Sequence, residues 1–373
     1  MRIVVVAETF LPEMNGVTNS VLRVVEHLDR RGHDVMVIAP GSGPGRVGRV
    51  PVERVPGVAL PRYSSISVGV PGRRLRQLIK GFAPDVVHVA APAVLGAAAV
   101  FIARDAGIPA VTIYQTDLAG FARRYHLPIA SAPLWRWLRH VHNAAAVTLV
   151  PSSTCAWDLR RNGIERVHLW ARGVDTERFS PERRCEAWRR QVSPRGRPIV
   201  GYSGRLAVEK GLHRLAPLAA RRDLQLVLVG DGPTRRRLTR TLRGARFVGF
   251  LDGTDLARAV ASFDVFVHPG IDETFCQAIQ EALASGVPVV GPAAGGPLDL
   301  IRHGENGFFW LPEEDDTIVT AVDSVLGDDD LRHRLGRAAQ ESVRHRTWER
   351  IGDDLLGHYV RSLPVPTRRL ATA

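Results

Sequence analysis

The chain has 373 residues, and 45% of them are hydrophobic, which is enough apolar material for two buried cores and argues against large-scale disorder. The formal net charge of +12 predicts attraction to an anionic partner, namely a nucleic acid, an acidic lipid or a phosphorylated substrate. Arginine supplies all but two of the 50 basic residues, so the charge could equally reflect the codon usage of a GC-rich genome.

The cysteines, Cys155, Cys185 and Cys276, are odd in number and widely spaced. This pattern predicts neither a disulfide framework nor a zinc site and fits a reducing cytosol. The N-terminus is a strand-like run that carries Glu8, unlike a signal peptide. The longest apolar stretch, 86–103, is interrupted by His88 and Pro92, so we expect a strand followed by a helix, not a membrane span. The sequence thus predicts a cytoplasmic protein.

Short β-branched runs bounded by glycine and proline alternate with longer helical patterns along the whole chain. The expected strands are 3–7, 35–39, 86–90, 110–114 and 147–150 in the first half and 199–203, 224–229, 265–268 and 287–290 in the second. Such alternation predicts an α/β fold with parallel sheets in two Rossmann-like domains. A ligand would bind in a cleft faced by the carboxyl ends of both sheets.

We expect the following order of parts along the chain. They are an N-terminal domain at 1–172, a linker at 173–198, a C-terminal domain at 199–347, a terminal helix at 348–362 and a loose tail at 363–373. The Arg- and Pro-bearing end of the linker marks the change from one series of strands to the next.

Two carboxylates, Glu273 and Glu281, stand eight residues apart around the start of an apolar helix. Eight steps of about 100° return the second carboxylate to nearly the side of the first, so both could address hydroxyls of one extended ligand. The alternative is that Glu273 only favours the positive end of the helix dipole and that Glu281 is solvated.

A second motif, Tyr-Ser-Gly-Arg-Leu-Ala-Val-Glu-Lys-Gly at 202–211, is a strand that ends in glycine and then presents two cations. Arg205 could grip phosphate oxygens with two parallel hydrogen bonds, and Lys210 would supply a compact charge. Together they could neutralise a leaving nucleoside diphosphate without a metal.

The order of these motifs resembles the retaining glycosyltransferases of family 4, which have the GT-B fold. The motifs are Gly-Arg-x4-Lys-Gly at 204–211, Val-Gly-Asp-Gly-Pro at 229–233, Glu-x7-Glu at 273–281 and Gly-Gly at 295–296. Residues 1–17 are similar to the first strand and glycine-bearing loop of that family, so the resemblance covers nearly the whole chain. Within the family, the closest resemblance is to actinobacterial GDP-mannose-dependent α-mannosyltransferases related to the phosphatidylinositol mannosyltransferases.

The resemblance implies transfer of a hexose, expected to be mannose from GDP-mannose, onto a glycolipid or phosphatidylinositol-type acceptor, with retention of configuration. No metal or other cofactor is expected beyond a stimulatory ion. Glu273 would hold sugar hydroxyls and Glu281 the ribose. The donor-binding residues that the resemblance implies are Gly16, Gly204, Arg205, Lys210, Gly230, Phe250, Phe275, Cys276 and Glu281.

Several positions depart from the family pattern or have a simpler explanation. Many relatives carry histidine where this chain has Gln115, which can position a sugar but cannot transfer protons. Asp117 could orient the acceptor or only form an Asx turn. Cys276 stands where many relatives have glycine. We expect its side chain to act as a small apolar group and not as a reactive thiol. Gly16 is a plain turn unless the resemblance holds.

A basic amphipathic helix is expected at 73–82. Its apolar residues recur at helical spacing against four cations, Arg73, Arg74, Arg76 and Lys80. This pattern suits an anionic lipid surface, although the apolar stripe could instead pack on the protein core. Basic and aromatic residues at 135–139 favour the same peripheral membrane association. Nucleic acid is disfavoured, because no familiar binding motif is present.

Two competing functions remain open, and a third is disfavoured by the sequence. A nicotinamide-dependent oxidoreductase would need Gly-x-Gly-x-x-Gly after the first strand, which this chain lacks. A non-catalytic protein of the same fold could bind sugar nucleotides or lipids. A glycosyltransferase could also use a UDP-sugar and a soluble acceptor, since no residue here discriminates guanine from uracil.

Overall fold

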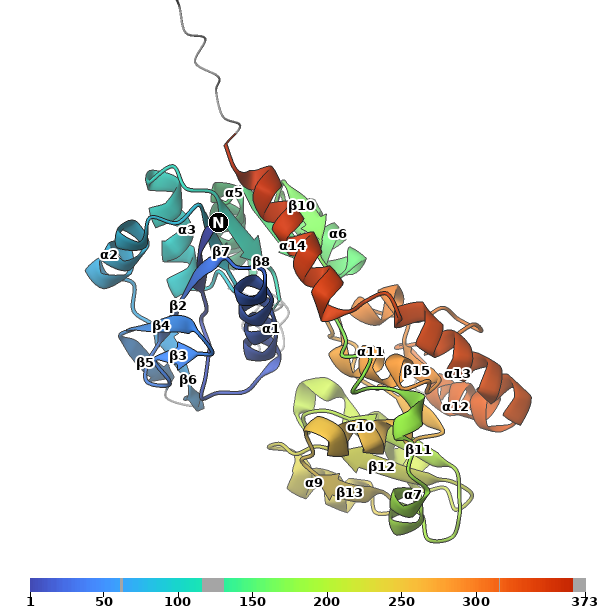
Figure 1. Cartoon of the computed structure of the whole chain (residues 1–373). Helices are drawn as coiled ribbons and strands as arrows, with labels where there is room; N and C mark the ends of the chain where they lie inside the picture. Colours follow the sequence, from blue (N-terminus) through green and yellow to red (C-terminus); the bar gives the residue numbers. More distant parts are fainter. Residues whose placement is uncertain (61–62, 116–130, 315, 365–373) are drawn as a thin grey trace, which may run out of the picture. The chain divides into compact units, whose positions relative to one another are not determined.

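The computed structural model describes the chain except for residues 61–62, 116–130, 315 and 365–373 (Figure 1). The chain divides into two compact units. Unit 1 comprises Met1–Ala171 and Ile351–Ala373, and unit 2 comprises Arg172–Arg350. Among the described residues, no helix combines the length and the apolar character needed to cross a bilayer.

Unit 1 is built on a sheet with the strand order β10-β9-β8-β7-β1-β2-β4-β3. Its strands are β1 (Arg2–Val6), β2 (Asp34–Pro40), β3 (Arg46–Val47), β4 (Val50–Val55), β7 (Val86–Val89), β8 (Ala110–Ile113), β9 (Val147–Val150) and β10 (Val167–Leu169). Neighbours pair in parallel, except that β3 runs antiparallel to β4. A separate hairpin joins β5 (Gly57–Leu60) to β6 (Tyr63–Gly69).

Helices cover both faces of this sheet. The described helices of unit 1 are α1 (Gly16–Arg30), α2 (Arg73–Phe82), α3 (Leu95–Asp105), α5 (Ser131–Ala144), α6 (Ser153–Arg161) and the part of α14 (Trp348–Ser362) from Ile351 onward. Apolar residues of α1 and α14 pack on one face, whereas those of α2, α3 and α5 pack on the other. With both faces covered, the strands are continuous apolar runs, which explains why short β-branched runs in the sequence located them.

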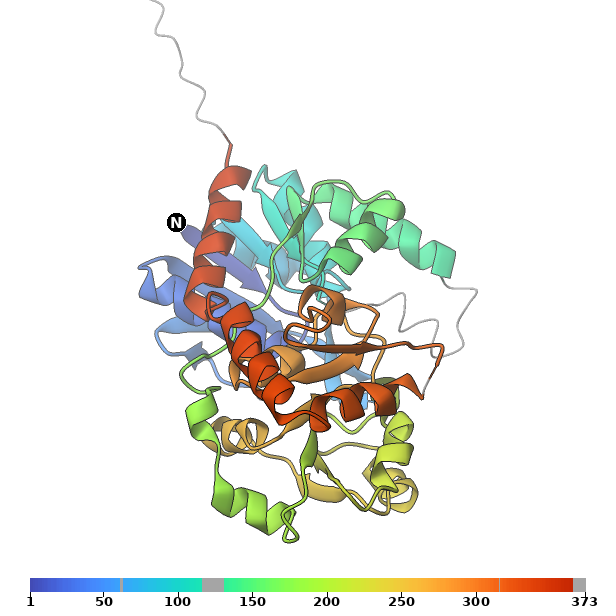
Figure 2. The ribbon, with the colours of Figure 1, turned by 90° about the vertical axis from the view of Figure 1, so that its right-hand side faces the viewer.

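The C-terminal helix α14 lies beside elements of unit 1 in both views (Figure 1, Figure 2). Trp170 Nε1 donates a hydrogen bond to Ile351 O at 2.9 Å. The buried Tyr359 hydroxyl lies 2.7 Å from Nδ1 of His88, and burial lowers the pKa of His88 to about 3, so this histidine is neutral and accepts the bond. Helix α14 is thereby fastened to the first sheet.

Helix α2 has its apolar stripe in the core of unit 1. Leu75 and Ile79 are fully buried, and Leu78 and Phe82 pack against the same cluster. The four cations of the helix are exposed, and Arg74 pairs with Glu53 at 3.2 Å. The structure therefore supports the alternative interpretation, in which the apolar stripe of this helix packs on the protein core. Only the charged side chains of α2 are left for an external partner.

Unit 2 contains a fully parallel sheet with the order β13-β12-β11-β14-β15-β16. Its strands are β11 (Ile199–Ser203), β12 (Gln225–Val229), β13 (Arg246–Gly249), β14 (Val265–Val267), β15 (Val289–Pro292) and β16 (Gly307–Trp310). Its described α-helices are α7 (Glu186–Val192), α8 (Ala216–Ala219), α9 (Arg235–Thr241), α10 (Gly253–Ala261), α11 (Gln277–Ala284), α12 (Thr317–Leu326) and α13 (Asp329–Val343).

The expected strands of both series are confirmed to within one or two residues, and two parallel α/β sheets are present. The strands β3 to β6 and the edge strands β10, β13 and β16 were not expected. β10 and β13 are only three or four residues long and carry exposed residues, so their sequences lack the apolar run of a central strand.

The segment 173–198, expected as a linker, contains α7 and packs on unit 2. Asp264, directly before β14, accepts hydrogen bonds from Arg184 at 2.9 Å, from Arg189 at 3.0 Å and from the backbone N–H of Ile199 at 2.7 Å. Burial alone would raise the pKa of Asp264, but these donors outweigh it and lower the pKa. An ionised carboxylate thus holds the segment against the sheet.

We expect D264N to lower the free energy of unfolding by about 3 kcal/mol, because two arginines would lose their buried anionic partner. Chemical denaturation of the purified protein measures this. D255N, which removes the exposed partner of Arg258 in the same unit, is the matched control and should cost less than about 1 kcal/mol. Equal effects of the two substitutions would contradict the role of Asp264.

Candidate functional site

A compact charged cluster lies where β11 and β14, neighbours in the sheet of unit 2, reach their carboxyl ends. Lys210 Nζ lies 2.5 Å from Glu273 Oε1, and His268 Nε2 lies 3.1 Å from the same oxygen. The Glu273 side chain is only 14% exposed. The sequence predicted both Lys210 and Glu273, and the structure brings them into direct contact.

Close backbone packing brings the two loops together. After β11 the chain turns through a short 3-10 helix (Val208–Lys210) and then through Gly211, which has φ +61°. A Cβ on Gly211 would lie 2.8 Å from the carbonyl oxygen of Pro269, so glycine is required where these loops meet. His268 follows β14 directly, and its ring stacks on the buried Tyr202 at 6.0 Å.

The electrostatics of the cluster keep it charged. Burial of Glu273 opposes ionisation, but the charge of Lys210 and the hydrogen bond from His268 outweigh it and lower the pKa to about 2. The pKa of Lys210 is raised, because the charge of Glu273 more than offsets the effect of burial. Glu273 is therefore an ionised acceptor, and Lys210 retains two donor hydrogens for another anion.

The Gly295-Gly296 turn packs against the loop that carries Glu273. The N–H of Gly296 donates to Glu273 O at 2.7 Å. A Cβ on Gly296 would lie 2.4 Å from the Cα of Phe275, and Gly295 has φ +63°. No larger residue fits, so this motif of the sequence holds the acidic loop in place.

Cys276 is the N-cap of α11 and adopts φ +74°, a conformation that residues other than glycine rarely take. Its side chain is buried, as is that of Phe275 before it. Burial and the charge of Glu273 raise the pKa of the thiol well above its ordinary value. The protonated, buried thiol agrees with the expected small apolar role.

Glu281 lies in the second turn of α11, and it is not the solvated residue of the alternative interpretation. Loss of water around the carboxyl group raises its pKa to about 8, although a hydrogen bond with Gln277 and the charge of Arg178 act in the opposite direction. Near neutral pH the Glu281 carboxyl group is largely protonated. The two acidic residues of the motif therefore differ in charge.

His268, Glu273 and Cys276 each offer a ligand atom, and these atoms lie within 4.8 Å of one another. Such a set could hold a soft divalent cation. Lys210 already neutralises the carboxylate, however, and the thiol is protonated. The cluster as it stands suits an uncharged hydroxylated ligand beside an anion better than it suits a metal.

The other predicted residues of unit 2 lie in loops that follow its strands, and not all of them contact the cluster. Arg205 is exposed, and within the described part of the chain its side chain has no ion-pair partner. Gly204 and Gly230 meet closely, since a Cβ on Gly230 would lie 2.0 Å from the carbonyl oxygen of Gly204. Phe250, just after β13, is 72% exposed. Arg205 and Phe250 are thus free to meet a ligand.

Two of the three predicted residues of unit 1 lie in its described part, one at the start of a helix and one after a strand. Gly16 is the first residue of α1, whose N-cap Asn15 accepts from the N–H groups of Val17 and Thr18 at 2.9 Å each. Gln115 follows β8, and its buried Nε2 donates to Ala90 O at 3.0 Å. Asp117 lies outside the described residues.

Sequence reasoning missed two residues of the cluster. His268 contacts Glu273 directly, and Arg172 is close enough for its charge to interact with that of Glu273. Burial lowers the pKa of Arg172 to about 10, so it remains cationic at neutral pH. The only sign in the sequence that His268 belongs to the cluster was its position at the end of an apolar strand. No sequence pattern indicated Arg172.

Two family models together match most of the chain. Residues 14–178 match "Glycosyltransferase Family 4", and residues 186–342 match "Glycosyl transferases group 1". A "GDP-mannose-dependent alpha-mannosyltransferase" of Mycolicibacterium smegmatis is 50% identical over 366 residues, which cover 96% of this chain and 97% of that protein. A protein of the same name from Corynebacterium glutamicum is 48% identical, with 99% of this chain and 91% of that protein covered.

A crystal structure of Anabaena Alr3699/HepE in complex with UDP superposes with a TM-score of 0.79, at 19% sequence identity, over 97% of this chain and all of that chain. At this low sequence identity, the likeness shows a shared fold and nothing about the ligand. The expected GT-B fold is confirmed by it and by a glycosyltransferase of lipopolysaccharide biosynthesis, WaaG, with a TM-score of 0.72 and 95% of this chain covered.

The pKa of Glu281 predicts a pH dependence of stability. Between pH 4.5, its ordinary pKa, and about 8, the folded chain retains a proton on Glu281 that the unfolded chain has released. The free energy of unfolding should therefore fall as the pH rises through this window. E281Q has no titrating group there, so its stability relative to the wild type should improve steadily from pH 5 to pH 8.

Urea denaturation at pH 5, 6.5 and 8 measures this difference. E305Q, which removes an exposed carboxylate of the same unit, is the control and should track the wild type at every pH. A stability difference between E281Q and the wild type that stays constant with pH would show that Glu281 titrates normally.

Proposed function

Because this chain belongs to glycosyltransferase family 4, we propose that it is a retaining α-mannosyltransferase that uses GDP-mannose as its donor. The names of the relatives from Mycolicibacterium and Corynebacterium support the donor, since both state dependence on GDP-mannose. The proposed acceptor is a glycolipid or a phosphatidylinositol-type lipid at the inner face of the plasma membrane. A relative from Mycobacterium tuberculosis, 30% identical over 369 residues, is named for mannosylation of phosphatidylinositol dimannoside.

The observation that carries this proposal is the contact between Lys210 and Glu273 at the carboxyl end of the unit 2 sheet. Hydroxyls of a sugar donate hydrogen bonds, and the ionised Glu273 offers them a strong acceptor. The remaining hydrogens of Lys210 can meet phosphate oxygens next to that sugar. One cluster thus addresses both the transferred ring and the leaving diphosphate.

The other donor contacts follow from the geometry of unit 2. Arg205, exposed and unpaired among the described residues, would share the charge of the departing diphosphate with Lys210. The backbone N–H groups of Phe275 and Cys276 stand beside Glu273 in sequence and would bind the ring or its phosphates. Glu281 would accept from the ribose, and this contact would favour its ionised form.

Further donor contacts come from glycines and an exposed ring. Gly204 and Gly230 would allow the nucleotide to approach the backbone closely. Phe250 would pack against the base.

Unit 1 is proposed to contribute two donor contacts and one candidate acceptor contact. Gly16, at the start of α1, would let a phosphate approach the backbone, and Gln115 would position the mannose without taking a proton. The proton of the attacking hydroxyl would pass to an oxygen of the diphosphate, on the face from which the diphosphate leaves. Asp117 remains a candidate for orienting that hydroxyl.

Membrane association is proposed to be electrostatic. Arg73, Arg74, Arg76 and Lys80 are exposed on α2, whereas the apolar stripe of this helix is buried in unit 1. Each cation close to an anionic bilayer contributes about 1 kcal/mol. Such attraction would bring the enzyme to a lipid acceptor without insertion of α2.

We expect K210A and E273Q each to lower turnover at least a hundredfold, on the scale of losing one contact that stabilises the transition state. Purified protein is incubated with radiolabelled GDP-mannose and membrane lipids, and labelled lipid is counted. E305Q is the matched carboxylate control and should retain full activity. Wild-type rates in K210A and E273Q would refute their roles.

The same assay separates the alternatives. Transfer from UDP-glucose but not from GDP-mannose would replace the proposed donor, and transfer only to soluble sugars would replace the lipid acceptor. Tight binding of GDP-mannose with no labelled product from any acceptor would favour a non-catalytic protein.

His268 is proposed as a positioning residue for Glu273. H268A should lower kcat about tenfold, because Glu273 would keep Lys210 but lose its second fixed donor. The donor KM and the melting temperature are measured in parallel. Partial recovery of kcat in H268Q, which retains a donor, would support positioning, and equal loss in both variants with an unchanged melting temperature would oppose it.

A further inference from the structure

An ion pair between Asp231 and Arg235 lies in the loop after β12 and at the start of α9. Arg235 Nη1 donates to Asp231 Oδ2 at 2.9 Å, and the N–H of Gly232 donates to Asp231 Oδ1 at 2.7 Å. The side chains of Asp231 and Arg235 are 52% and 38% exposed. The pair is therefore held by its own contacts and is still accessible to a ligand.

This pair is close to Phe250, the residue proposed to pack against the base. Strands β12 and β13 are neighbours, and the N–H of Gly230 donates to Gly249 O at 2.7 Å where the two strands end. A Cβ on Gly249 would lie 3.6 Å from Arg235 Nη1. Phe250 is the next residue, and it is 72% exposed. An exposed ring and a paired guanidinium group thus stand together at the end of β13.

The loop that carries the pair is fastened to the loop that carries Arg205. The N–H of Leu206 donates to Asp231 O at 2.9 Å, and the N–H of Thr234 donates to Leu206 O at 3.0 Å. A Cβ on Gly232 would lie 2.4 Å from the same carbonyl oxygen of Leu206. Arg205, which is proposed to meet the diphosphate, directly precedes Leu206. The pair therefore has a fixed place relative to the proposed diphosphate site.

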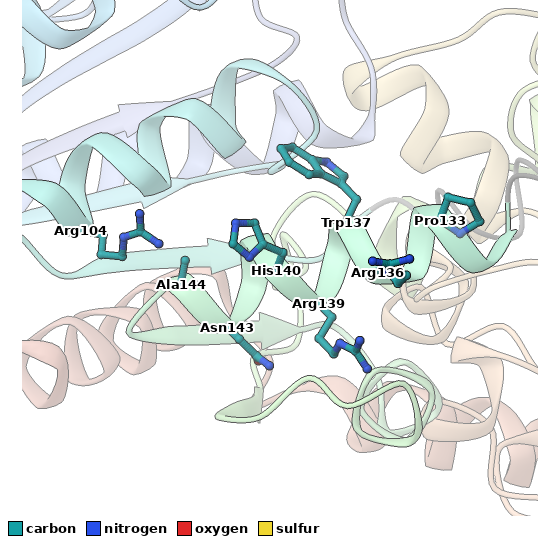
Figure 3. A pocket seen from close by; sticks show the side chains of 8 residues that line it. All are labelled: Arg104, Pro133, Arg136, Trp137, Arg139, His140, Asn143 and Ala144. Atoms are coloured by element: carbon teal, nitrogen blue, oxygen red, sulfur yellow. The ribbon is translucent and has the colours of Figure 1, made fainter.

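Asp231 orients the guanidinium group of Arg235, as a base-recognising arginine requires. Other exposed arginines differ in this respect. Arg136 and Arg139 line an open hollow of about 780 Å³ on α5 in unit 1 (Figure 3), and they have no ion-pair partner within the described part of the chain. No ion pair orients those two groups, whereas Arg235 presents its remaining N–H groups in a direction that the carboxylate sets.

Asp231 is an ionised acceptor with capacity to spare. The hydrogen bond from the N–H of Gly232, together with Arg235, lowers the pKa of the Asp231 carboxyl group. An ionised carboxylate has about four lone-pair sites, and these two contacts use two of them. Asp231 can therefore accept from two donors of a ligand while it still holds Arg235.

A donor beside two free acceptor sites matches one edge of guanine. Guanine presents the acceptor O6 next to two donors, N1–H and the 2-amino group. Uracil has the oxygen O2 where guanine has the amino group, and this oxygen would face the carboxylate of Asp231. Adenine reverses the order, since it has an amino donor at the position of O6 and an acceptor at N1. Guanine is therefore the base that satisfies both side chains.

We propose that Asp231 and Arg235 select guanine as the base of the donor. Arg235 donates to O6, Asp231 accepts from N1–H and the 2-amino group, and Phe250 packs against the ring. This assignment rests on the proposed use of GDP-mannose. It gives the selection of the base, which the sequence left open, to two named side chains.

Calorimetric titration of the purified protein with GDP, IDP and UDP tests the assignment. The base of IDP keeps O6 and N1–H but lacks the 2-amino group of guanine. The wild type should bind GDP about tenfold or more tightly than IDP or UDP, on the scale of one specific base contact. D231N should reduce the preference for GDP over IDP to less than about threefold, because an amide nitrogen replaces one carboxylate oxygen.

R235Q should give a different signature in the same titration. O6 is common to GDP and IDP, so the affinity for both should fall about tenfold while the preference between them is kept. The control E341Q/R344Q removes an exposed ion pair of α13 in the same unit and should change each affinity less than about twofold. Each preference compares two ligands of one variant, so partial unfolding of a variant does not alter it.

Steady-state kinetics with GDP-mannose separate base selection from catalysis. D231N should raise the donor KM and leave kcat nearly unchanged, because a contact to the base is equally strong in the ground state and the transition state. A preference of the wild type for GDP that D231N retains would overturn the assignment and leave the proposed donor in place. A wild type that does not prefer GDP to UDP would contradict the proposed donor as well.

Discussion

The ion pair between Lys210 and Glu273 is the interaction on which the candidate donor site depends. It joins the loops after two neighbouring strands, β11 and β14, and places a carboxylate where little water remains to solvate it. Such a group is stable as an anion only with a cation and further donors, which Lys210 and His268 provide. A sugar bound as proposed would therefore meet an acceptor that is already charged and oriented, so little reorganisation would be needed on binding.

The backbone around this pair is packed as tightly as its side chains. Gly211 meets the carbonyl of Pro269, and Gly296 meets Phe275, at distances that leave no space for a Cβ. Both contacts join loops that follow different strands, so the carboxyl ends of the neighbouring strands β11, β14 and β15 are connected. Within these packed loops Cys276 adopts a left-handed conformation, which the surrounding structure must impose.

Arginine serves different purposes in the two units. In unit 2, Arg184 and Arg189 are held by Asp264 and fasten a connecting segment to the sheet. In unit 1, Arg136 and Arg139 have no such partner among the described residues and face an open hollow. The positive charge of the chain is therefore partly structural and partly available to anions, which composition alone could not separate.

The sequence by itself determined the two series of parallel strands, because strands covered on both faces must be continuously apolar. It also predicted Lys210 and Glu273 as residues of the site, since both stand in recognisable motifs in the loops that follow strands. Only the tertiary structure decided that Glu273 is ionised whereas Glu281 is largely neutral, that His268 contacts Glu273, and that the stripe of α2 is buried. Ionisation and burial depend on neighbours distant in the chain, as Lys210 and Glu273 are separated by 63 positions, and no local pattern records such contacts.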